Sequence, residues 1–212
     1  MSDQSFVPPA LRARIRGGAE PLAAGLGRLG LTPNALTVMG FLISCAAAAL
    51  CALGIWLPGG VVSLAGAAFD LLDGSLARVS GRTSRLGAFF DSTFDRWGEG
   101  VVYAGIVTGG VAAAEPVTAV LAALAMSSAF MVSYTRAKAE GLGFHGEVGV
   151  APRAERVVLL GLGLIGAGAS GGIRAGLPWL QAALAVLFIL ATITTIQRVL
   201  HVRAQDRVQR QS

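Results

Sequence analysis

The sequence predicts an all-α integral membrane protein with six transmembrane helices and an N-terminal amphipathic helix on the membrane surface. Hydrophobic residues make up 54% of the 212 residues and charged residues only 14%, whereas a soluble domain usually carries about 25% charged residues. Several apolar runs approach the roughly 20 residues that span the hydrocarbon core of a bilayer. The runs are continuous rather than alternating, which argues against a β-barrel.

The N-terminal segment, residues 1–30, has no apolar core of the kind that marks a signal peptide. Three arginines between positions 12 and 16 precede Leu22, Leu26 and Leu29, which fall on one helical stripe. We therefore expect a helix on the cytoplasmic membrane surface with its basic residues toward anionic lipid. A disordered basic tail is the alternative.

Turn signals separate the apolar runs into six spans. Thr32 and Pro33 supply a capping hydroxyl and a proline for the first helical position, and residues 80–83 form a tight polar turn. The spans are expected at about 32–53, 60–79, 84–113, 116–141, 153–169 and 179–200. The chain then forms one domain over residues 1–212, with the surface helix at 1–30, the six-helix core at 31–204 and a basic tail at 205–212.

The basic residues predict the orientation of these spans. With the N-terminus in the cytoplasm, sixteen of the seventeen Lys and Arg residues fall on the cytoplasmic side, and only Arg174 falls outside. This bias is the one that orients membrane helices, so both termini are expected in the cytoplasm. The cytoplasmic residues are Arg12, Arg14, Arg16, Arg28, Arg78, Arg82, Arg85, Arg96, Arg136, Lys138, Arg153, Arg156, Arg198, Arg203, Arg207 and Arg210.

The net charge of +5 is explained by this orientation rather than by nucleic-acid binding. Cys45 and Cys51 are six residues apart in the first apolar run, so they point to different sides of a helix and are interpreted as packing residues. With only His145 and His201 available, a His-rich zinc site is not expected.

Four of the twelve acidic residues, Asp70, Asp73, Asp91 and Asp95, lie in the second and third predicted spans. A charged side chain at mid-bilayer costs about 2.5–3.5 kcal/mol on insertion scales. Four unpaired carboxylates facing lipid would therefore cost roughly 10 kcal/mol, comparable to the whole stability of a small protein. We expect them to face a polar cavity near the cytoplasmic surface, with cations to neutralise them.

The spacing of the aspartates brings each pair onto one helical face. Asp70 and Asp73 are three apart, and Asp91 and Asp95 are four apart. The short turn between the two spans predicts antiparallel neighbouring helices whose carboxylate pairs face each other. Carboxylate oxygens without His or Cys suit Mg²⁺ or Mn²⁺, and four of them can hold two ions, as in metal-assisted phosphoryl transfer. Arg78 is a candidate cation for phosphate.

Two other interpretations of the aspartates remain open at this point. They could be buried acids paired with Arg78, Arg82, Arg85 and Arg96. They could also form a cation relay in a transporter, but a relay predicts acidic residues at mid-membrane over several helices, whereas these cluster on two.

The full pattern adds to the aspartates a glycine, an alanine, an arginine and a second glycine. Written out, it is Asp70-x2-Asp73-Gly74-x2-Ala77-Arg78-x8-Gly87-x3-Asp91-x3-Asp95. This pattern resembles the signature of the CDP-alcohol phosphotransferase family, and the resemblance covers the whole chain. The resemblance implies a membrane enzyme that transfers a phosphate-bearing group from a CDP-linked donor to an alcohol and releases CMP.

The resemblance also implies residue roles. Asp70, Asp73, Asp91 and Asp95 would bind Mg²⁺ or Mn²⁺, and Asp95 would also be the general base that takes the acceptor's proton. Glu99, one turn beyond Asp95, would extend the polar stripe. The residues implied to border the CDP donor are Asn34, Ala35, Leu36, Thr37, Gly74, Ala77, Arg78, Ser84 and Gly87.

The cytoplasmic ends of the later spans bear on the acceptor. Residues 133–140, Glu155-Arg156 and Gln197-Arg198 resemble the phosphatidylinositol phosphate synthases of actinobacterial type, which use CDP-diacylglycerol and inositol 1-phosphate (1D-myo-inositol 3-phosphate). Cations that converge from three spans suit a phosphorylated acceptor. The candidate acceptor-phosphate residues are Ser133, Arg136, Lys138, Arg156 and Arg198.

The alternative acceptor is glycerol 3-phosphate, as in the phosphatidylglycerophosphate synthases. Those enzymes commonly carry an arginine a few residues after the first-span start, where this chain has Val38, Met39 and Gly40. The family resemblance further implies a homodimer in the cell membrane with its active site toward the cytoplasm. His145 has no visible partner in the sequence and is interpreted as incidental.

Overall fold

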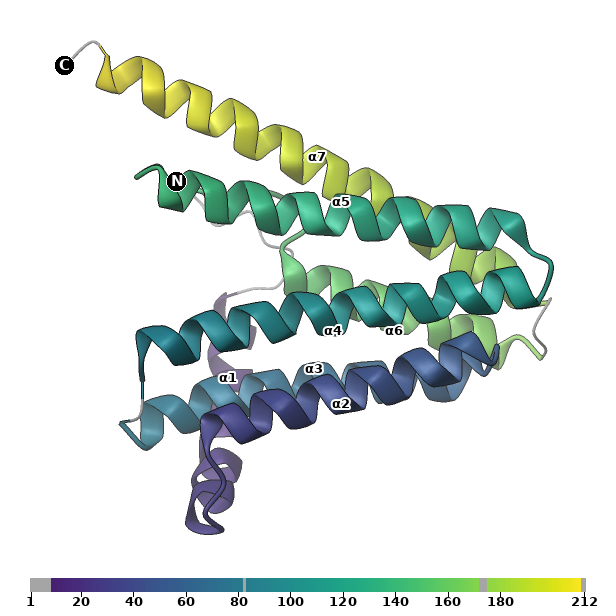
Figure 1. Ribbon diagram of the computed structural model, residues 1–212, viewed down its shortest axis with the longest axis horizontal. Coiled ribbons are helices and arrows are strands. Elements are labelled where there is room, and N and C mark those ends of the chain that lie inside the picture. Colours follow the sequence, from purple (N-terminus) through teal and green to yellow (C-terminus); the bar gives the residue numbers. More distant parts are fainter. Residues whose placement is uncertain (1–8, 82, 172–174, 211–212) are drawn as a thin grey trace.

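The computed structural model describes residues 9–81, 83–171 and 175–210, without the side chains of residues 9–16, 19 and 20; Arg12, Arg14, Arg16, Arg82 and Arg174 therefore lie outside the described side chains. Within these residues every regular element is helical, which confirms the all-α prediction (Figure 1). The helices are α1 (Pro9–Arg28), α2 (Pro33–Ala52), α3 (Trp56–Val79), α4 (Arg85–Ala112), α5 (Pro116–Gly141), α6 (Arg153–Ala169) and α7 (Leu177–Gln209).

Helices α2 to α7 run along one bundle with alternating direction, and α1 crosses it at one end (Figure 1). Helix α2 packs against both α3 and α4, α5 packs against α4 and α7, and α6 packs against α3 and α7. The expectation that α3 and α4 pack as direct neighbours was wrong, because they make few contacts despite their short connection. Their separation leaves room between the two aspartate-bearing helices.

Two hydroxyl caps fix the helix starts that border this space. Thr32 Oγ1 accepts a hydrogen bond from Ala35 N at 3.2 Å, with Pro33 in the first turn of α2. Ser84 Oγ accepts from Gly87 N at 2.9 Å at the start of α4. Such caps satisfy backbone donors that lack a partner within the helix. The predicted polar turn contains Gly81, whose φ of 64° is a left-handed conformation that suits glycine.

Two boundaries differ from the expected ones. Helix α3 begins at Trp56 rather than near Gly60. Helix α7 extends to Gln209, so most of the segment expected as a tail is helical, because residues 201–209 contain neither Gly nor Pro to end the helix.

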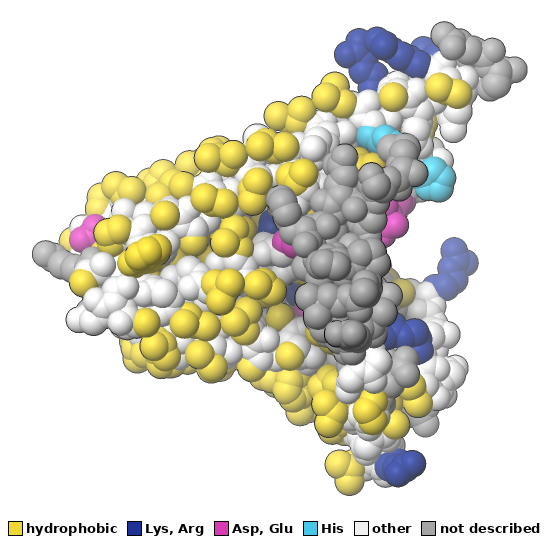
Figure 2. All heavy atoms as spheres, turned by 180° about the vertical axis from the view of Figure 1, so that it is seen from behind, with side chains coloured by type: hydrophobic (Ala, Val, Ile, Leu, Met, Phe, Trp, Pro, Cys, Tyr) yellow, Lys and Arg dark blue, Asp and Glu magenta, His cyan; other side chains and the backbone are white. Residues whose placement is uncertain are grey.

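Four helices, α2, α3, α5 and α7, are long and apolar enough to cross a membrane. Among the other two helices of the bundle, α4 carries Asp91, Asp95, Arg96 and Glu99 in its first half, and α6 is 17 residues long. The outward surface of the body is largely hydrophobic, and Lys and Arg side chains gather at the end where the α7 C-terminus and α1 lie (Figure 2). The structure thus supports a membrane protein.

Small residues allow α2 and α4 to approach closely. A Cβ added at Gly105 of α4 would collide with the backbone of Ala48, and one at Gly109 would collide with Cys51 O. Around this contact Trp56, Tyr103 and further apolar residues from α5, α6 and α7 form the main buried cluster. A smaller cluster of Ala23, Leu36 and Leu76 joins α1 to the start of α2 and the end of α3. Helix α1 therefore braces the helices that carry the motif.

We expect Gly105→Ala to destabilise the fold by about 1–3 kcal/mol, because overpacking forces backbone shifts where the neighbouring atoms belong to the backbone of Ala48. The measurement is the midpoint of thermal unfolding in detergent. The matched control is Gly166→Ala in α6, where an added Cβ meets nothing within 4 Å. An equal midpoint for both variants would contradict the close α2–α4 packing.

Candidate active site

The four aspartates line the space between α3 and α4. Asp73 is 3% exposed and accepts a 2.8 Å hydrogen bond from Thr37 Oγ1 of α2. Asp70 lies one turn away, and Asp91 and Asp95 project from α4. A Cβ added at Gly40 would come within 2.9 Å of Asp70 Oδ1, so this glycine of α2 provides the room that the carboxylate occupies. Helix α2 thus contacts both aspartates of α3: it binds Asp73 by a hydrogen bond and leaves room for Asp70.

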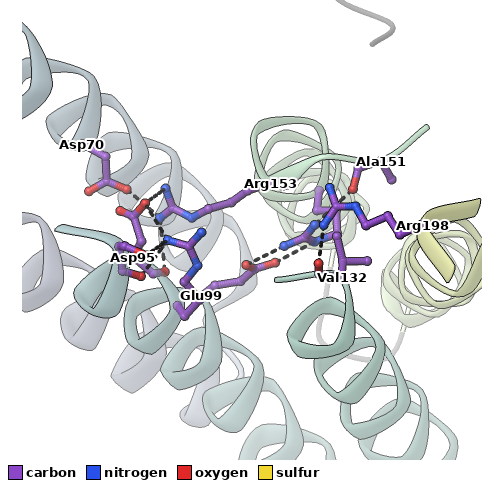
Figure 3. Close-up of polar contacts among 10 residues, drawn as sticks. Asp70, Asp95, Glu99, Val132, Ala151, Arg153 and Arg198 are labelled. Carbon is purple, nitrogen blue, oxygen red and sulfur yellow. Dashed lines mark hydrogen bonds and ion pairs between the residues drawn. The ribbon is translucent and has the colours of Figure 1, made fainter. Parts of the chain in front are cut away.

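Arg153, the first residue of α6, joins the two aspartate pairs. Its Nη2 donates to Asp70 Oδ2 at 2.7 Å and to Asp95 O at 3.2 Å, and its Nη1 lies 3.0 Å from Asp95 Oδ2 (Figure 3). Arg96 Nη1 lies farther from Asp95 Oδ2, at 3.6 Å, and donates more closely to Ser92. One guanidinium therefore supplies the main positive charge that the carboxylates receive from the protein.

A cavity of about 220 Å³ opens beside the aspartates. It contains seven of the nine residues expected to border the CDP donor, together with two of the aspartates. Arg78 lies at its exposed rim, where its Nη2 donates to Ser75 Oγ at 3.0 Å. The cavity is lined by Pro33, Asn34, Thr37, Asp73, Gly74, Ala77, Arg78, Thr83, Ser84, Gly87, Ala88 and Asp91.

Ala35 and Leu36, the other two expected donor residues, do not line this cavity. Leu36 is fully buried against Ala23 and Leu76, and the backbone N–H of Ala35 is used by the Thr32 cap. These two positions shape the start of α2 rather than the wall of the cavity.

The donor set suits a divalent cation, because carboxylate oxygens are the ligands preferred by Mg²⁺ and Mn²⁺. Within the described part of the chain, no three Asp, Glu, His or Cys residues lie close enough to form a metal-binding group. The residues therefore fit the metal in their chemistry, while Asp70 and Asp95 are paired with a guanidinium.

A second ion pair lies deeper, beside the first. Arg156 donates from Nε to Glu99 Oε1 at 3.0 Å and from Nη2 to Glu99 Oε2 at 2.9 Å, and its Nη1 donates to Ala151 O at 3.0 Å. Arg156 is 1% exposed. Next to this pair a small cavity of about 20 Å³, lined in part by Ser44, Ser63 and Arg153, has room for one water molecule.

The candidate acceptor residues come together at the ends of α5, α6 and α7. Arg198 donates to Val132 O, adjacent to Ser133, and from Nε to Val148 O at 2.8 Å. It lies within electrostatic reach of Arg136 and Arg156. Arg136 pairs with Glu140 at 2.8 Å and with Glu147 at 2.6 Å, and Lys138 is exposed. Three guanidinium groups from three helices thus gather in one region.

Helix α7 fixes the loop between α5 and α6 by a row of side-chain hydrogen bonds. Gln205 accepts from His145 N and donates to His145 O, both at 2.9 Å. Gln197 accepts from Val150 N at 3.2 Å, and Thr194 accepts from Ala151 N at 3.0 Å. The backbone of His145 is thus held by α7, while the interpretation of its side chain as incidental stays a prediction. This loop leads directly into Arg153 and Arg156 and sets their position.

Sequence reasoning missed the role of Arg153, Gln197 and Gln205. It counted Arg153 only toward membrane orientation. The available signal was its depth in the predicted topology: an arginine at the predicted cytoplasmic start of a span is expected near the same membrane surface as the aspartates. For the two glutamines no comparable signal exists, because a polar side chain on an extended helix is ordinarily solvated.

The fold and the site define a helical membrane protein in which clustered carboxylates adjoin a cavity with a cation at its rim. The chain belongs to the CDP-alcohol phosphatidyltransferase family, whose model matches residues 30–197.

Two relatives that are 37–39% identical to this chain are named as inositol phosphate lipid synthases. The chain is 39% identical over 193 residues to the archaetidylinositol phosphate synthase of Methanothermobacter thermautotrophicus, covering 90% of this chain and 91% of the relative. It is 37% identical over 203 residues to the phosphatidylinositol phosphate synthase of Mycobacterium marinum, covering 93% and 83%.

Solved structures agree with these sequence relatives. The crystal structure of the Mycobacterium tuberculosis phosphatidylinositol phosphate synthase with CDP-DAG bound matches with a TM-score of 0.77 and 31% identity, over 87% of this chain and 92% of that one. The same enzyme in complex with manganese and citrate matches with a TM-score of 0.79 and 30% identity, over 87% and 88%.

We expect Arg156→Met to destabilise the protein by about 3–5 kcal/mol, because Glu99 would remain buried without its partner. The double variant Arg156→Met/Glu99→Leu should recover most of this loss. Thermal unfolding in detergent measures both variants, with the exposed Arg203→Met as control. If Arg156→Met were as stable as the wild type and only the KM for the acceptor rose, Arg156 would instead contact the acceptor substrate directly.

Proposed function

We propose that this protein transfers the phosphatidyl group from CDP-diacylglycerol to a hydroxyl of 1D-myo-inositol 3-phosphate, giving phosphatidylinositol phosphate and CMP in phospholipid biosynthesis. The observation that carries the proposal is the 220 Å³ cavity, which gathers the donor motif beside the aspartates. The names of the relatives and the CDP-DAG in a related crystal structure support this choice of substrates.

In this proposal the cavity holds the CDP end of the donor. Gly74 and Gly87 leave backbone accessible on facing helices, since neither carries a Cβ that would fill the space. Arg78 at the rim complements the diphosphate charge. Ser84 and Asn34 border the same space from the starts of α4 and α2. The acyl chains of the donor would extend into lipid along the apolar outer surface.

The reaction is a displacement at phosphorus. The acceptor hydroxyl oxygen forms a bond to the phosphatidyl phosphorus, the bond from that phosphorus to the CMP oxygen breaks, and CMP leaves with the electron pair. The hydroxyl proton passes to Asp95 as general base. In this proposal Asp70, Asp73, Asp91 and Asp95 would hold two Mg²⁺ or Mn²⁺ ions. When bound, the metal would stabilise negative charge on the phosphate oxygens.

The acceptor's phosphate would bind among Ser133, Arg136, Lys138, Arg156 and Arg198. Support comes from the contacts of three arginines with one loop: Arg136 pairs with Glu147, Arg198 donates to Val148 O and Arg156 donates to Ala151 O. Guanidinium groups from three helices suit a phosphate. Exposed Lys138 and half-exposed Arg136 are the direct contacts in this proposal. Buried Arg156 and Arg198, bonded to protein carbonyls, hold the position of the others.

The proposed enzyme has six spans, with both termini and the active site on the cytoplasmic side. Support comes from the alternating helices, the basic end of the molecule and the polar starts of α4 and α6 at that end (Figure 2). In this orientation the acceptor site would face soluble inositol phosphate, while the donor would stay in the bilayer. A homodimer in the cell membrane completes the proposal.

We expect CMP release from CDP-diacylglycerol to depend on a divalent cation and to be fastest with inositol 3-phosphate. Purified protein would be assayed in detergent with inositol 3-phosphate, glycerol 3-phosphate, free inositol or serine, each with Mg²⁺, with Mn²⁺ and with excess chelator. The chelator should abolish the reaction because four carboxylates cannot stabilise a phosphate without a cation.

Preference for glycerol 3-phosphate would contradict inositol 3-phosphate as the acceptor, but it would still agree with phosphatidyl transfer from CDP-diacylglycerol. Metal flux into vesicles without CMP release from any acceptor would instead support the transporter interpretation.

We expect Asp95→Asn to lower kcat by about 10²–10⁴-fold, the usual contribution of a general base, with little effect on CDP binding. Turnover and the affinity for CDP would be measured on the same preparation. Asp206→Asn, at a surface pair with Arg210, is the matched control. Full turnover by Asp95→Asn would exclude the base assignment.

A further inference from the structure

We infer that Arg153 is an exchangeable counter-cation of the carboxylate site: it neutralises Asp70 and Asp95 before the divalent cation binds, and the cation then displaces it toward the acceptor's phosphate. The inference rests on the proposed function for its second half only. Its first half concerns the protein and the metal alone.

The contacts of Arg153 are those of a substitute for a bound cation. Its two terminal nitrogens reach Oδ2 of Asp70 at 2.7 Å and Oδ2 of Asp95 at 3.0 Å. These carboxylates lie 83 and 58 residues away in the chain, on two helices that make few contacts with each other. The guanidinium therefore ties together the two halves of the motif, as a shared metal would.

The Oδ2 atoms of Asp70 and Asp95 cannot bind both Arg153 and a divalent cation as closely as they bind either one alone. Mg²⁺ and Mn²⁺ take carboxylate oxygens as close ligands and bring two positive charges. A guanidinium at hydrogen-bond distance from those atoms would be repelled by the ion. Arg153 and the divalent cation thus compete for Asp70 and Asp95.

The position of Arg153 permits the exchange. It is the first residue of α6, directly after the loop, and its side chain is 26% exposed. Among the described residues its Nε has no hydrogen-bond partner. Arg156, one turn later, contrasts with it, because its side chain is 1% exposed and bonded through all three nitrogens. A side-chain rotation can release Arg153, whereas releasing Arg156 would require unpacking the bundle.

Arg153 directly follows the loop in which Arg136 pairs with Glu147 and Arg198 donates to Val148 O. In this proposal its released side chain adds a cation on the side of that loop. The region for the acceptor's phosphate then becomes more positive when the metal is bound. By thermodynamic linkage, metal and acceptor phosphate each raise the affinity of the other. The site would bind the second substrate more tightly once the carboxylates hold their cation.

The first test measures Mn²⁺ affinity without any substrate, from the electron paramagnetic resonance signal of free Mn²⁺ over purified protein. Arg153→Met removes the competing charge, so the affinity should rise about tenfold or more. The matched control is Arg96→Met, which also removes a cation near Asp95 but one at 3.6 Å whose closer bonds go to Ser92. Its affinity should change less than about threefold.

Unchanged or weaker Mn²⁺ binding by Arg153→Met would overturn the inference, since the arginine would then support the metal site. If that variant does not fold, Arg153→Lys keeps the charge but loses the paired donors. Its Mn²⁺ affinity should lie above that of the wild type, and an affinity equal to or below the wild type would count against the exchange.

The second test measures binding of inositol 3-phosphate by calorimetry with and without Mn²⁺. The wild type should bind it several-fold more tightly with Mn²⁺, and Arg153→Met should lose most of this coupling. If Mn²⁺ strengthened inositol 3-phosphate binding equally in the wild type and in Arg153→Met, the claim that Arg153 moves toward the acceptor's phosphate would be overturned. No binding of inositol 3-phosphate by the wild type would count against the proposed acceptor, while the Mn²⁺ competition of the first test would stand separately.

Discussion

Carboxylates brought together inside an apolar helical bundle repel one another, and the structure is arranged around the cations that offset this repulsion. Asp70 and Asp95 share Arg153, and Glu99 has Arg156. Both arginines come from the first turn of α6, three positions apart, so one short helix supplies the charge for two other helices. Helix α6 therefore serves the bundle both by its polar beginning and by Leu160, Leu164 and Ala167, which lie in the main buried cluster.

The close packing of α2 against α3 and α4 allows these two helices to stay apart. Helix α2 lies against both, and at Gly105 and Gly109 it approaches α4 so closely that a methyl group would not fit. Because α2 fixes both helices, they need not touch each other along their polar stretch. The space left between them is the cavity that faces the donor motif. Tight apolar packing and an open polar site are thus two results of the same arrangement.

The helical class, the helix starts and the position of the carboxylates could be predicted from the sequence, because hydropathy, caps and spacing along one helix are local properties. The α3–α4 separation could not, since a short turn usually implies packed neighbours. Nor could the partners of Arg153 and Arg198. An arginine at a membrane edge can meet lipid, solvent, a carboxylate or a backbone carbonyl, and only the three-dimensional path of the α5–α6 loop decides which.

The hydrogen bonds from α7 to that loop also bear on the order in which the protein assembles during its synthesis. The donor cavity is built from residues 33–91, all of which leave the ribosome early. The backbone of residues 145–151 receives its side-chain partners from Thr194, Gln197, Arg198 and Gln205. The loop therefore cannot reach its final path until the last helix has been made and inserted. A chain interrupted before α7 would contain every residue that lines this cavity but would lack the side chains that hold the loop between α5 and α6.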